Sequence, residues 1–230
     1  MAKEYKPYET FAGSPASQGK LQFDMWGVTP KRSEWKQLKL DVQKHGLRNS
    51  LLVAPMPTAS TAQILGNTES FEPRTTNLYT RRVLSGEYMV INPVLQDKLI
   101  AKGLWTPELS KHLIEHRGSI QNTTLPKTIK QTFKTVWELS QKALIDMSVA
   151  RSPYICQSQS LNLFVESPNF KRLSSMHFYG WEQGLKTGIY YLRRKPRHQP
   201  QQFTIQPKEK DADGNVINAG EDEECLMCGA

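Results

Sequence analysis

Apolar residues recur every three or four positions in several stretches of the chain, which is the spacing of an amphipathic helix. The longest such stretch is 126–150, where Pro126 suits the first helical turn. Another runs over 33–45 and is followed by Gly46, a residue type that commonly ends helices. The pattern also predicts helices over 62–65, 93–102, 106–117 and 176–186, the last of these capped by Ser174 or Ser175.

Short apolar runs between the predicted helices indicate strands. Residues 49–54 are mostly apolar without alternation, which predicts a strand buried on both faces, as parallel sheets contain. Residues 161–166 and 187–192 also have extended character. Because helices alternate with buried strands, the chain is predicted to have an α/β fold with parallel strands. Residues 1–32 are rich in glycine, proline and serine and are expected to be irregular, apart from a short element near 21–26.

From residue 196 onward the chain is rich in proline and glutamine and then in charged residues. Too few apolar residues remain in this region to offset the entropy of ordering it, which predicts a flexible tether. We therefore divide the sequence into an ordered part, 1–196, and a tail, 197–230. The tail carries Cys225 and Cys228, two thiols separated by two residues close to the end of the sequence.

The net charge of +8 is unevenly distributed. Residues 208–230 contain two lysines and seven acidic residues, a net charge of −5, and the preceding residues contain 28 basic and 15 acidic residues, a net charge of +13. Such a body attracts anions, so a phosphorylated substrate, a nucleic acid or an acidic partner could bind it, although a solvated basic surface is the plainer explanation. The sequence lacks an aromatic-basic recognition motif, so we expect no nucleic-acid partner.

The sequence shows no sign of a membrane or secreted protein. No stretch approaches the ~20 apolar residues that cross a bilayer, and the first residues lack the apolar core of a signal peptide. Three cysteines are too few, and odd in number, for a scaffold held together by disulfides. The sequence therefore predicts a cytoplasmic protein without a membrane partner.

A candidate phosphate-binding loop follows the apolar run at 49–54. It consists of Pro57, Thr58, Ala59, Ser60 and Thr61. Backbone N–H groups at the start of a helix lack partners and carry partial positive charge, so such a turn suits a phosphate group, and the hydroxyls could add donors. The residue types alone favour the simpler interpretation that Ser60 or Thr61 merely caps the helix.

A pair of tyrosines, Tyr190 and Tyr191, lies near the end of the extended segment 187–192. Neighbouring residues of a strand point to opposite faces, so two stacked rings at this place would need an irregular backbone. Tyrosine can carry an electron as a phenoxyl radical when its proton has somewhere to go. Tyrosines that only pack, with their hydroxyls hydrogen-bonded, are far more common.

The tail cysteines Cys225 and Cys228 could exchange disulfides or bind a metal. A thiolate attacks a disulfide, and a second thiol nearby resolves the mixed disulfide. Zinc normally takes four ligands, and the sequence has no second pair of this spacing, so redox exchange is favoured. His112 and His116 lack the His-Glu-x-x-His order of a hydrolytic zinc site, and Cys156 is expected to be structural. We therefore expect no metal site.

Several blocks of the sequence are long enough to be specific to one protein family. They include Asn-Leu-Tyr-Thr-Arg-Arg at 77–82, Lys-Thr-Val-Trp-Glu at 134–138 and Gln-Ser-Gln-Ser-Leu-Asn at 157–162. Further blocks lie at 48–52, 55–61, 66–67, 176–181 and 187–193. Taken together, and in their order along the chain, these blocks resemble the C-terminal third of the large (alpha) subunit of class I ribonucleotide reductase, of the eukaryotic and viral type. The resemblance covers essentially the whole chain.

The resemblance implies a fold and a set of roles. The family fold is a ten-stranded α/β barrel, of which this chain would supply the later strands and helices. The loop matching 57–61 cradles the diphosphate of the ribonucleotide substrate. The tyrosines matching Tyr190 and Tyr191 relay an oxidising equivalent from the metal cofactor of the small (beta) subunit to an active-site cysteine. The cysteines matching Cys225 and Cys228 re-reduce the active-site disulfide and are then reduced by thioredoxin or glutaredoxin.

The resemblance also implies what this chain lacks. The family's thiyl-radical cysteine, the two cysteines oxidised in turnover and the regions that bind ATP and deoxynucleotide effectors all precede the matched region. We therefore expect the chain to bind no cofactor itself. It should convert ribonucleoside diphosphates to 2′-deoxyribonucleoside diphosphates only together with the N-terminal part of the alpha subunit. The alternative is a non-catalytic fragment that only binds the small subunit or the alpha body.

Overall fold

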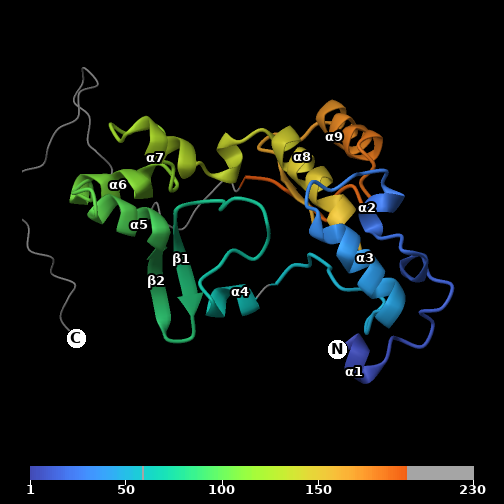
Figure 1. Cartoon of the computed structure of the whole chain (residues 1–230). Coiled ribbons are helices and arrows are strands. Elements are labelled where there is room, and N and C mark those ends of the chain that lie inside the picture. Colours follow the sequence, from blue (N-terminus) through green and yellow to red (C-terminus); the bar gives the residue numbers. More distant parts are fainter. Residues whose placement is uncertain (59, 196–230) are drawn as a thin grey trace, which may run out of the picture. The chain divides into compact units, whose positions relative to one another are not determined.

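The computed structural model describes residues 1–58 and 60–195 of the chain (Figure 1). Ala59 and the predicted tail, with its two terminal cysteines, lie outside the described residues. Within the described residues, no helix combines the length with the apolar character that a membrane crossing requires.

The chain divides into two compact units. The first contains Met1–Asn77 and resumes at Ser119, and the second contains Leu78–Gly118. The first unit begins with a series of helices: α1 (Ala2–Tyr5), η1 (Ala16–Gln18), α2 (Gln22–Met25), α3 (Glu34–His45) and α4 (Ser60–Ile64).

Helix α3 ends where the sequence predicts. Gly46 follows its last residue with a φ of 77°, a backbone conformation that favours glycine. A Cβ atom at this position would also lie 2.5 Å from Cβ of Pro7, which is too close for any other residue type. The helix is held by Trp35, whose ring meets the buried ring of Phe23 edge-on at 4.9 Å between centroids.

The C-terminal half of the first unit holds an apolar core. Its elements are α7 (Lys127–Thr132), η2 (Val136–Glu138), α8 (Gln141–Arg151), η3 (Ser152–Tyr154), β3 (Asn162–Phe164), α9 (Phe170–Glu182) and β4 (Tyr191–Arg193). Val136, Ile145 and Leu163 are almost fully buried in this core. Met176 and Leu185 pack against it, so the core joins η2, α8, β3 and α9.

Strands β3 and β4 pair in parallel, as the sequence predicts, with Asn162 opposite Tyr191 and Phe164 opposite Arg193. The second strand begins at Tyr191 rather than at 187 as predicted. The peptide N–H of Tyr190 extends this pairing by donating to the carbonyl oxygen of Leu161 at 2.7 Å. Because the segment between the two strands contains α9, the pair forms a parallel β-α-β crossover.

The prediction of one helix over 126–150 is wrong, because the structure divides this stretch into α7, η2 and α8. Apolar residues that suggested it, such as Ile129, Val136 and Ile145, are buried, but the backbone turns between them. Thr135 starts η2 with a capping box, in which its N–H donates to Glu138 Oε2 at 2.7 Å. The next N–H, of Val136, donates to the distant carbonyl of Arg74 rather than to the preceding helical turn.

Two further predictions need correction. Helix α9 begins at Phe170 rather than 176, because the side chain of Asn169 caps it by accepting from the N–H of Arg172 at 2.9 Å. The segment 49–54 is not a buried strand. Its apolar side chains are exposed, 53% for Leu51 and 60% for Leu52, since the described residues supply no ladder of strands around it.

The second unit contains a hairpin that the sequence analysis did not predict. Strands β1 (Leu78–Val83) and β2 (Gly86–Ile91) pair antiparallel. The helices α5 (Pro93–Ile100) and α6 (Pro107–Glu115) follow, close to their predicted ranges. The ring of His112 on α6 stacks on that of His116, which follows the end of the helix, at 3.8 Å between centroids. Burial, followed by the charge of His116, lowers the pKa of His112.

A hydrogen bond to the carboxyl group of Asp146 joins α8 to α9. The hydroxyl of Tyr179 donates to Asp146 Oδ1 at 2.5 Å, and Lys142 Nζ donates to Asp146 Oδ2 at 2.9 Å. These two hydrogen bonds, that of Tyr179 first, lower the pKa of the Asp146 carboxyl. A carboxyl with a lower pKa in the folded state stabilises the fold above its unfolded pKa, and this contribution is lost as pH falls through the folded pKa.

We therefore expect the melting temperature of the protein to fall when the pH drops below about 4. Asp146→Asn should melt earlier at neutral pH and should lose less stability on acidification, because its amide does not titrate. Thermal melts followed by circular dichroism between neutral and acidic pH measure both effects. Identical pH profiles for the two proteins would contradict this role of Asp146.

Candidate functional site

The candidate phosphate loop leads into α4, a helix close to the one that the sequence predicts. Thr58 is fixed to the segment beyond that helix, because its N–H and its hydroxyl both donate to the carbonyl oxygen of Glu69, at 3.1 and 3.2 Å. The hydroxyl-bearing residues Ser60 and Thr61 are exposed, and Ala59 lies outside the described residues. The described part of the loop therefore leaves Ser60 and Thr61 exposed, whereas the hydroxyl of Thr58 is bonded to Glu69.

The tyrosine pair has the close geometry that the sequence left open. The ring centroids of Tyr190 and Tyr191 lie 4.3 Å apart, with 55° between the ring planes. Regular strand β4 begins only at Tyr191, so Tyr190 lies in the irregular backbone just before it, and the two rings can lie close together. The guanidinium of Arg193 lies 5.2 Å from the centre of the Tyr191 ring.

The two phenols influence each other. The neighbouring phenol of Tyr191, first through its hydroxyl and then through its charge, raises the pKa of Tyr190. About half of each side chain is exposed, 49% for Tyr190 and 51% for Tyr191. The pair is therefore a close couple of phenols that another molecule can reach.

The short segment 159–162 connects the loop to the tyrosines. The N–H of Ser160 donates to the carbonyl of Pro55 at 3.0 Å, just before the loop. Leu161 accepts from the N–H of Tyr190, and Asn162 donates to the carboxylate of Glu72 through both its backbone N–H and its side-chain amide, at 2.9 and 3.1 Å. Three chain segments that are distant in the sequence therefore meet at the start of β3.

Sequence reasoning missed the buried polar residues of this junction. Glu72, Gln159 and Asn162 are each no more than 7% exposed. The amide of Gln159 donates to the Ser148 carbonyl at 2.8 Å and accepts from Nε of Arg151 at 3.1 Å. The sequence offered one sign of this network, the run of polar residues just before a short apolar strand. Polar residues at such a place form either a loop or a buried hydrogen-bond network.

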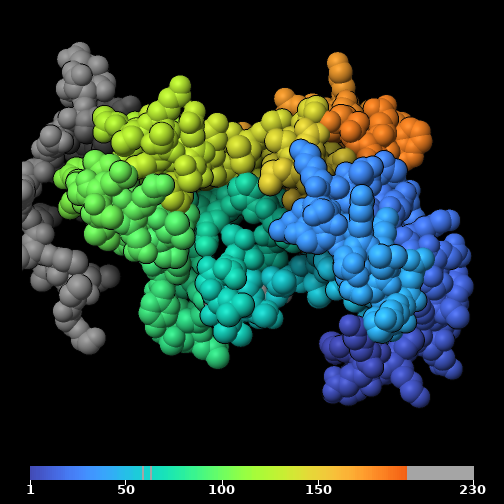
Figure 2. All heavy atoms as spheres, viewed as in Figure 1, coloured from blue at the N-terminus to red at the C-terminus, as the bar shows by residue number. Residues whose placement is uncertain are grey.

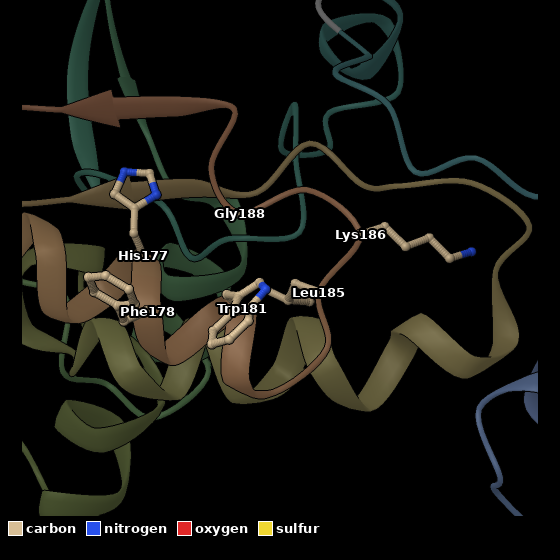
Figure 3. Close-up of a pocket in the computed structure, with 6 residues that line it drawn as sticks. All are labelled: His177, Phe178, Trp181, Leu185, Lys186 and Gly188. Atoms are coloured by element: carbon tan, nitrogen blue, oxygen red, sulfur yellow. The ribbon is translucent and has the colours of Figure 1, made fainter.

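A hollow of about 470 Å³ opens beside the tyrosine strand (Figure 3). His177, Phe178 and Trp181 line it from α9, and Leu185, Lys186 and Gly188 line it from the segment that leads to β4. Phe178 and Trp181 are 63% and 72% exposed, and the spheres of α9 lie open at the surface (orange in Figure 2). The face of the first unit next to the tyrosines is therefore apolar and accessible.

Cys225 and Cys228 lie outside the described residues. Cys156 is half-buried, and its sulfur accepts from the N–H of Leu52 at 3.3 Å, in agreement with a structural role. Among residues 1–58 and 60–195, no three His, Cys, Asp or Glu side chains gather closely enough to hold a metal ion.

Comparison with known proteins gives a consistent set of relatives. Residues 1–191 match the family described as ribonucleotide reductase, barrel domain. The ribonucleoside-diphosphate reductase large chain of Cryptosporidium parvum is 53% identical over 257 residues, and the large subunit of Caenorhabditis elegans is 52% identical over 235 residues, each match covering 99% of this chain. The large subunit of vaccinia virus is 54% identical over 206 residues, which cover 89% of this chain.

A solved structure agrees with these relatives. The alpha subunit of a class Id ribonucleotide reductase from Actinobacillus ureae is similar with a TM-score of 0.56 and 26% identity, over 79% of this chain and 36% of that chain. The matches confirm the predicted α/β fold as part of the ribonucleotide reductase barrel, and the resemblance to the eukaryotic and viral large subunits. The chain spans about a third of the length of these relatives, from 27% to 32%.

Proposed function

Because this chain belongs to the ribonucleotide reductase barrel-domain family, we propose that it provides the C-terminal part of the large subunit of a ribonucleoside-diphosphate reductase. The observation that carries the proposal is the tyrosine pair, with its rings 4.3 Å apart and about half of each side chain exposed. Phenols in this arrangement can exchange an electron and a proton over a short distance. Their exposure lets a partner that generates the oxidising equivalent approach them.

The remaining site residues fit successive steps of the same reaction. The 57–61 loop holds the diphosphate of the substrate, with Ser60 and Thr61 as accessible donors. Tyr190 and Tyr191 pass the oxidising equivalent to a cysteine in the N-terminal part of the large subunit. Cys225 and Cys228 then return reducing equivalents to the disulfide formed in turnover, and thioredoxin or glutaredoxin reduces them in turn.

The partners of the chain follow from the same assignment of reaction steps. The radical originates at the metal cofactor of the small subunit, and the ATP and deoxynucleotide effectors bind the N-terminal part of the large subunit. We place the reaction in the cytoplasm. The exposed apolar run Leu51, Leu52 and Val53, at 48–60% exposure, supports the need for the N-terminal part, because such a surface normally packs against other protein.

Reconstitution tests the proposal. The chain is mixed with the N-terminal part of the large subunit, the small subunit, thioredoxin and its reductase, and the conversion of CDP to dCDP is measured. We expect product only when all components are present. Stable assembly of the complex without dCDP formation would favour the alternative, a fragment that binds the alpha body or the small subunit without completing a site.

Removing the hydroxyls of Ser60 and Thr61 by double alanine substitution should raise the KM for CDP about tenfold or more and change kcat little, because a hydrogen bond to a charged group contributes about 1.5–3 kcal/mol. Thr68→Ala is the matched control, since the hydroxyl of Thr68 is also exposed but donates to the carbonyl of Ser70. Steady-state kinetics of the assembled enzyme give both constants. An unchanged KM in the double variant would remove these hydroxyls from the diphosphate site.

A further inference from the structure

The buried carboxylate of Glu72 occupies an unusual position at the edge of β3. The carbonyl of Leu161 accepts from the N–H of Tyr190, and the N–H of Val165 donates to the carbonyl of Arg193. The alternate residues Asn162 and Phe164 therefore turn their backbone groups to the opposite edge of β3. Unpaired N–H groups at a buried strand edge are costly. Side chains satisfy both of them in this structure.

Two different side chains satisfy this edge. Glu72 Oε1 accepts from the N–H of Asn162 at 2.9 Å, and Gln141 Oε1 accepts from the N–H of Phe164 at 2.7 Å. Gln141 comes from the start of α8, and its amide nitrogen donates to the carbonyls of Val136 and Leu139, so its contacts stay within the core. Glu72 comes from the segment that holds the phosphate loop.

The connection from Glu72 to the loop is short. Glu69, three residues earlier, accepts both hydrogen bonds of Thr58. A second contact ties this segment to β3, because the guanidinium of Arg151 lies 4.7 Å from the Phe71 ring centre while its Nε donates to Gln159. The segment 69–72 is therefore fixed to the loop at one end and to the start of β3 at the other.

The connection from Glu72 to the tyrosines is equally short. Asn162, which donates to Glu72 through two groups, pairs with Tyr191 across the parallel strands. Its neighbour Leu161 accepts from the N–H of Tyr190. At 6% exposure the Glu72 carboxylate needs hydrogen-bond partners, and Asn162 supplies two of them, so Glu72 is fixed at the start of β3.

We propose that Glu72 is a positioning residue that couples the 57–61 loop to the strand carrying Tyr190 and Tyr191. Through this carboxylate, the seating of the substrate diphosphate and the placement of the tyrosine pair depend on each other. The inference rests on the proposed function, since it assigns the loop to the diphosphate and the tyrosines to radical transfer. It adds a residue that touches neither substrate nor radical but fixes both sites to one strand.

The test compares Glu72→Ala with Gln141→Ala in the assembled large subunit. Both changes remove an acceptor from the same strand edge, so both should lower the melting temperature. Glu72→Ala should in addition weaken equilibrium binding of CDP, measured without the small subunit, about tenfold, in line with the loss of hydrogen bonds to a charged group. It should also lower kcat with the small subunit present, whereas Gln141→Ala should leave the CDP dissociation constant and kcat near those of the parent.

Two conservative variants keep the test decisive. Glu72→Gln should restore most of the CDP affinity, because its amide oxygen can still accept from the N–H of Asn162. The Asn162 amide, whose Oδ1 has no partner among the described residues, can rotate to accept from the new amide nitrogen. Glu72→Asp retains the charge but is one methylene shorter, so it should bind CDP weakly. It replaces the alanine variant if that variant fails to fold.

The outcomes separate the coupling from the proposed function. Parent-like CDP affinity and kcat in a folded Glu72→Ala or Glu72→Asp variant would overturn the coupling. An equal loss of CDP affinity in Gln141→Ala would overturn it as well, because general loosening of the strand would then explain the effect. Failure of the parent enzyme itself to bind CDP would instead count against the proposed function.

Discussion

Replacing either Tyr190 or Tyr191 with phenylalanine is expected to reduce dCDP formation by the assembled enzyme to the background of the assay. Phenylalanine preserves the ring packing at 4.3 Å but lacks the phenolic O–H, so it cannot release a proton and an electron together. Because the proposed relay passes through both tyrosines in series, each single change should be as damaging as both combined. The rate of dCDP formation at saturating CDP measures the effect.

Tyr154→Phe provides the matched control. Tyr154 is similarly exposed, at 45%, and its ring packs against Phe23 and Trp35 with centroids 6.2 and 6.4 Å away, so it lies in an aromatic cluster outside the pair. Its loss of a hydroxyl should leave turnover near that of the parent. Turnover that survives both Tyr190→Phe and Tyr191→Phe would exclude the radical relay, whatever the control shows.

The second large effect concerns the tail. Cys225→Ser or Cys228→Ser should limit the thioredoxin-dependent reaction to about the product formed before the active-site disulfide needs re-reduction, because a single thiol cannot both attack a disulfide and resolve the mixed disulfide. A small dithiol such as dithiothreitol, which reaches the active site directly, should restore continued turnover. Product yield per large subunit under the two reductants measures this.

Trapping identifies the target of the tail. In Cys225→Ser or Cys228→Ser the remaining tail thiol should form a mixed disulfide with a cysteine of the N-terminal part, visible on a non-reducing gel and by mass spectrometry of the linked peptides. Cys156 serves as the internal control, since it is half-buried and should not appear in the linked peptides. Undiminished thioredoxin-dependent turnover in both serine variants would show that the tail pair is not the reductant.

The fold was predictable where local residues decide it. Helix α3 ends at His45 because the next residue, Gly46, has a φ of 77°, a backbone conformation that favours glycine. Helix α6 begins after Thr106, whose side chain accepts from the N–H of Leu109. The break in 126–150 was harder, because the bond from Val136 to the distant carbonyl of Arg74 helps to set it. The segment 49–54 was predicted as buried because its residues are apolar, but burial depends on neighbours that the described residues do not supply.

The candidate site was predictable only residue by residue. The sequence drew attention to the hydroxyl loop and to Tyr190 and Tyr191 because their residue types are chemically distinctive. It could not show that the rings lie together, since this depends on where β4 begins. Glu72 was missed entirely, because the fold alone brings it to Asn162, 90 residues away.

The most direct test of the central claim is to observe the radical on this chain. 3-Aminotyrosine, which is oxidised more easily than tyrosine, is incorporated at position 190 of the complete large subunit and mixed with the small subunit, CDP and ATP. We predict that an aminotyrosyl radical appears in the electron paramagnetic resonance spectrum as the small-subunit radical is consumed. Loss of the small-subunit radical without any signal at position 190, or no loss at all in an assembled complex, would contradict the account.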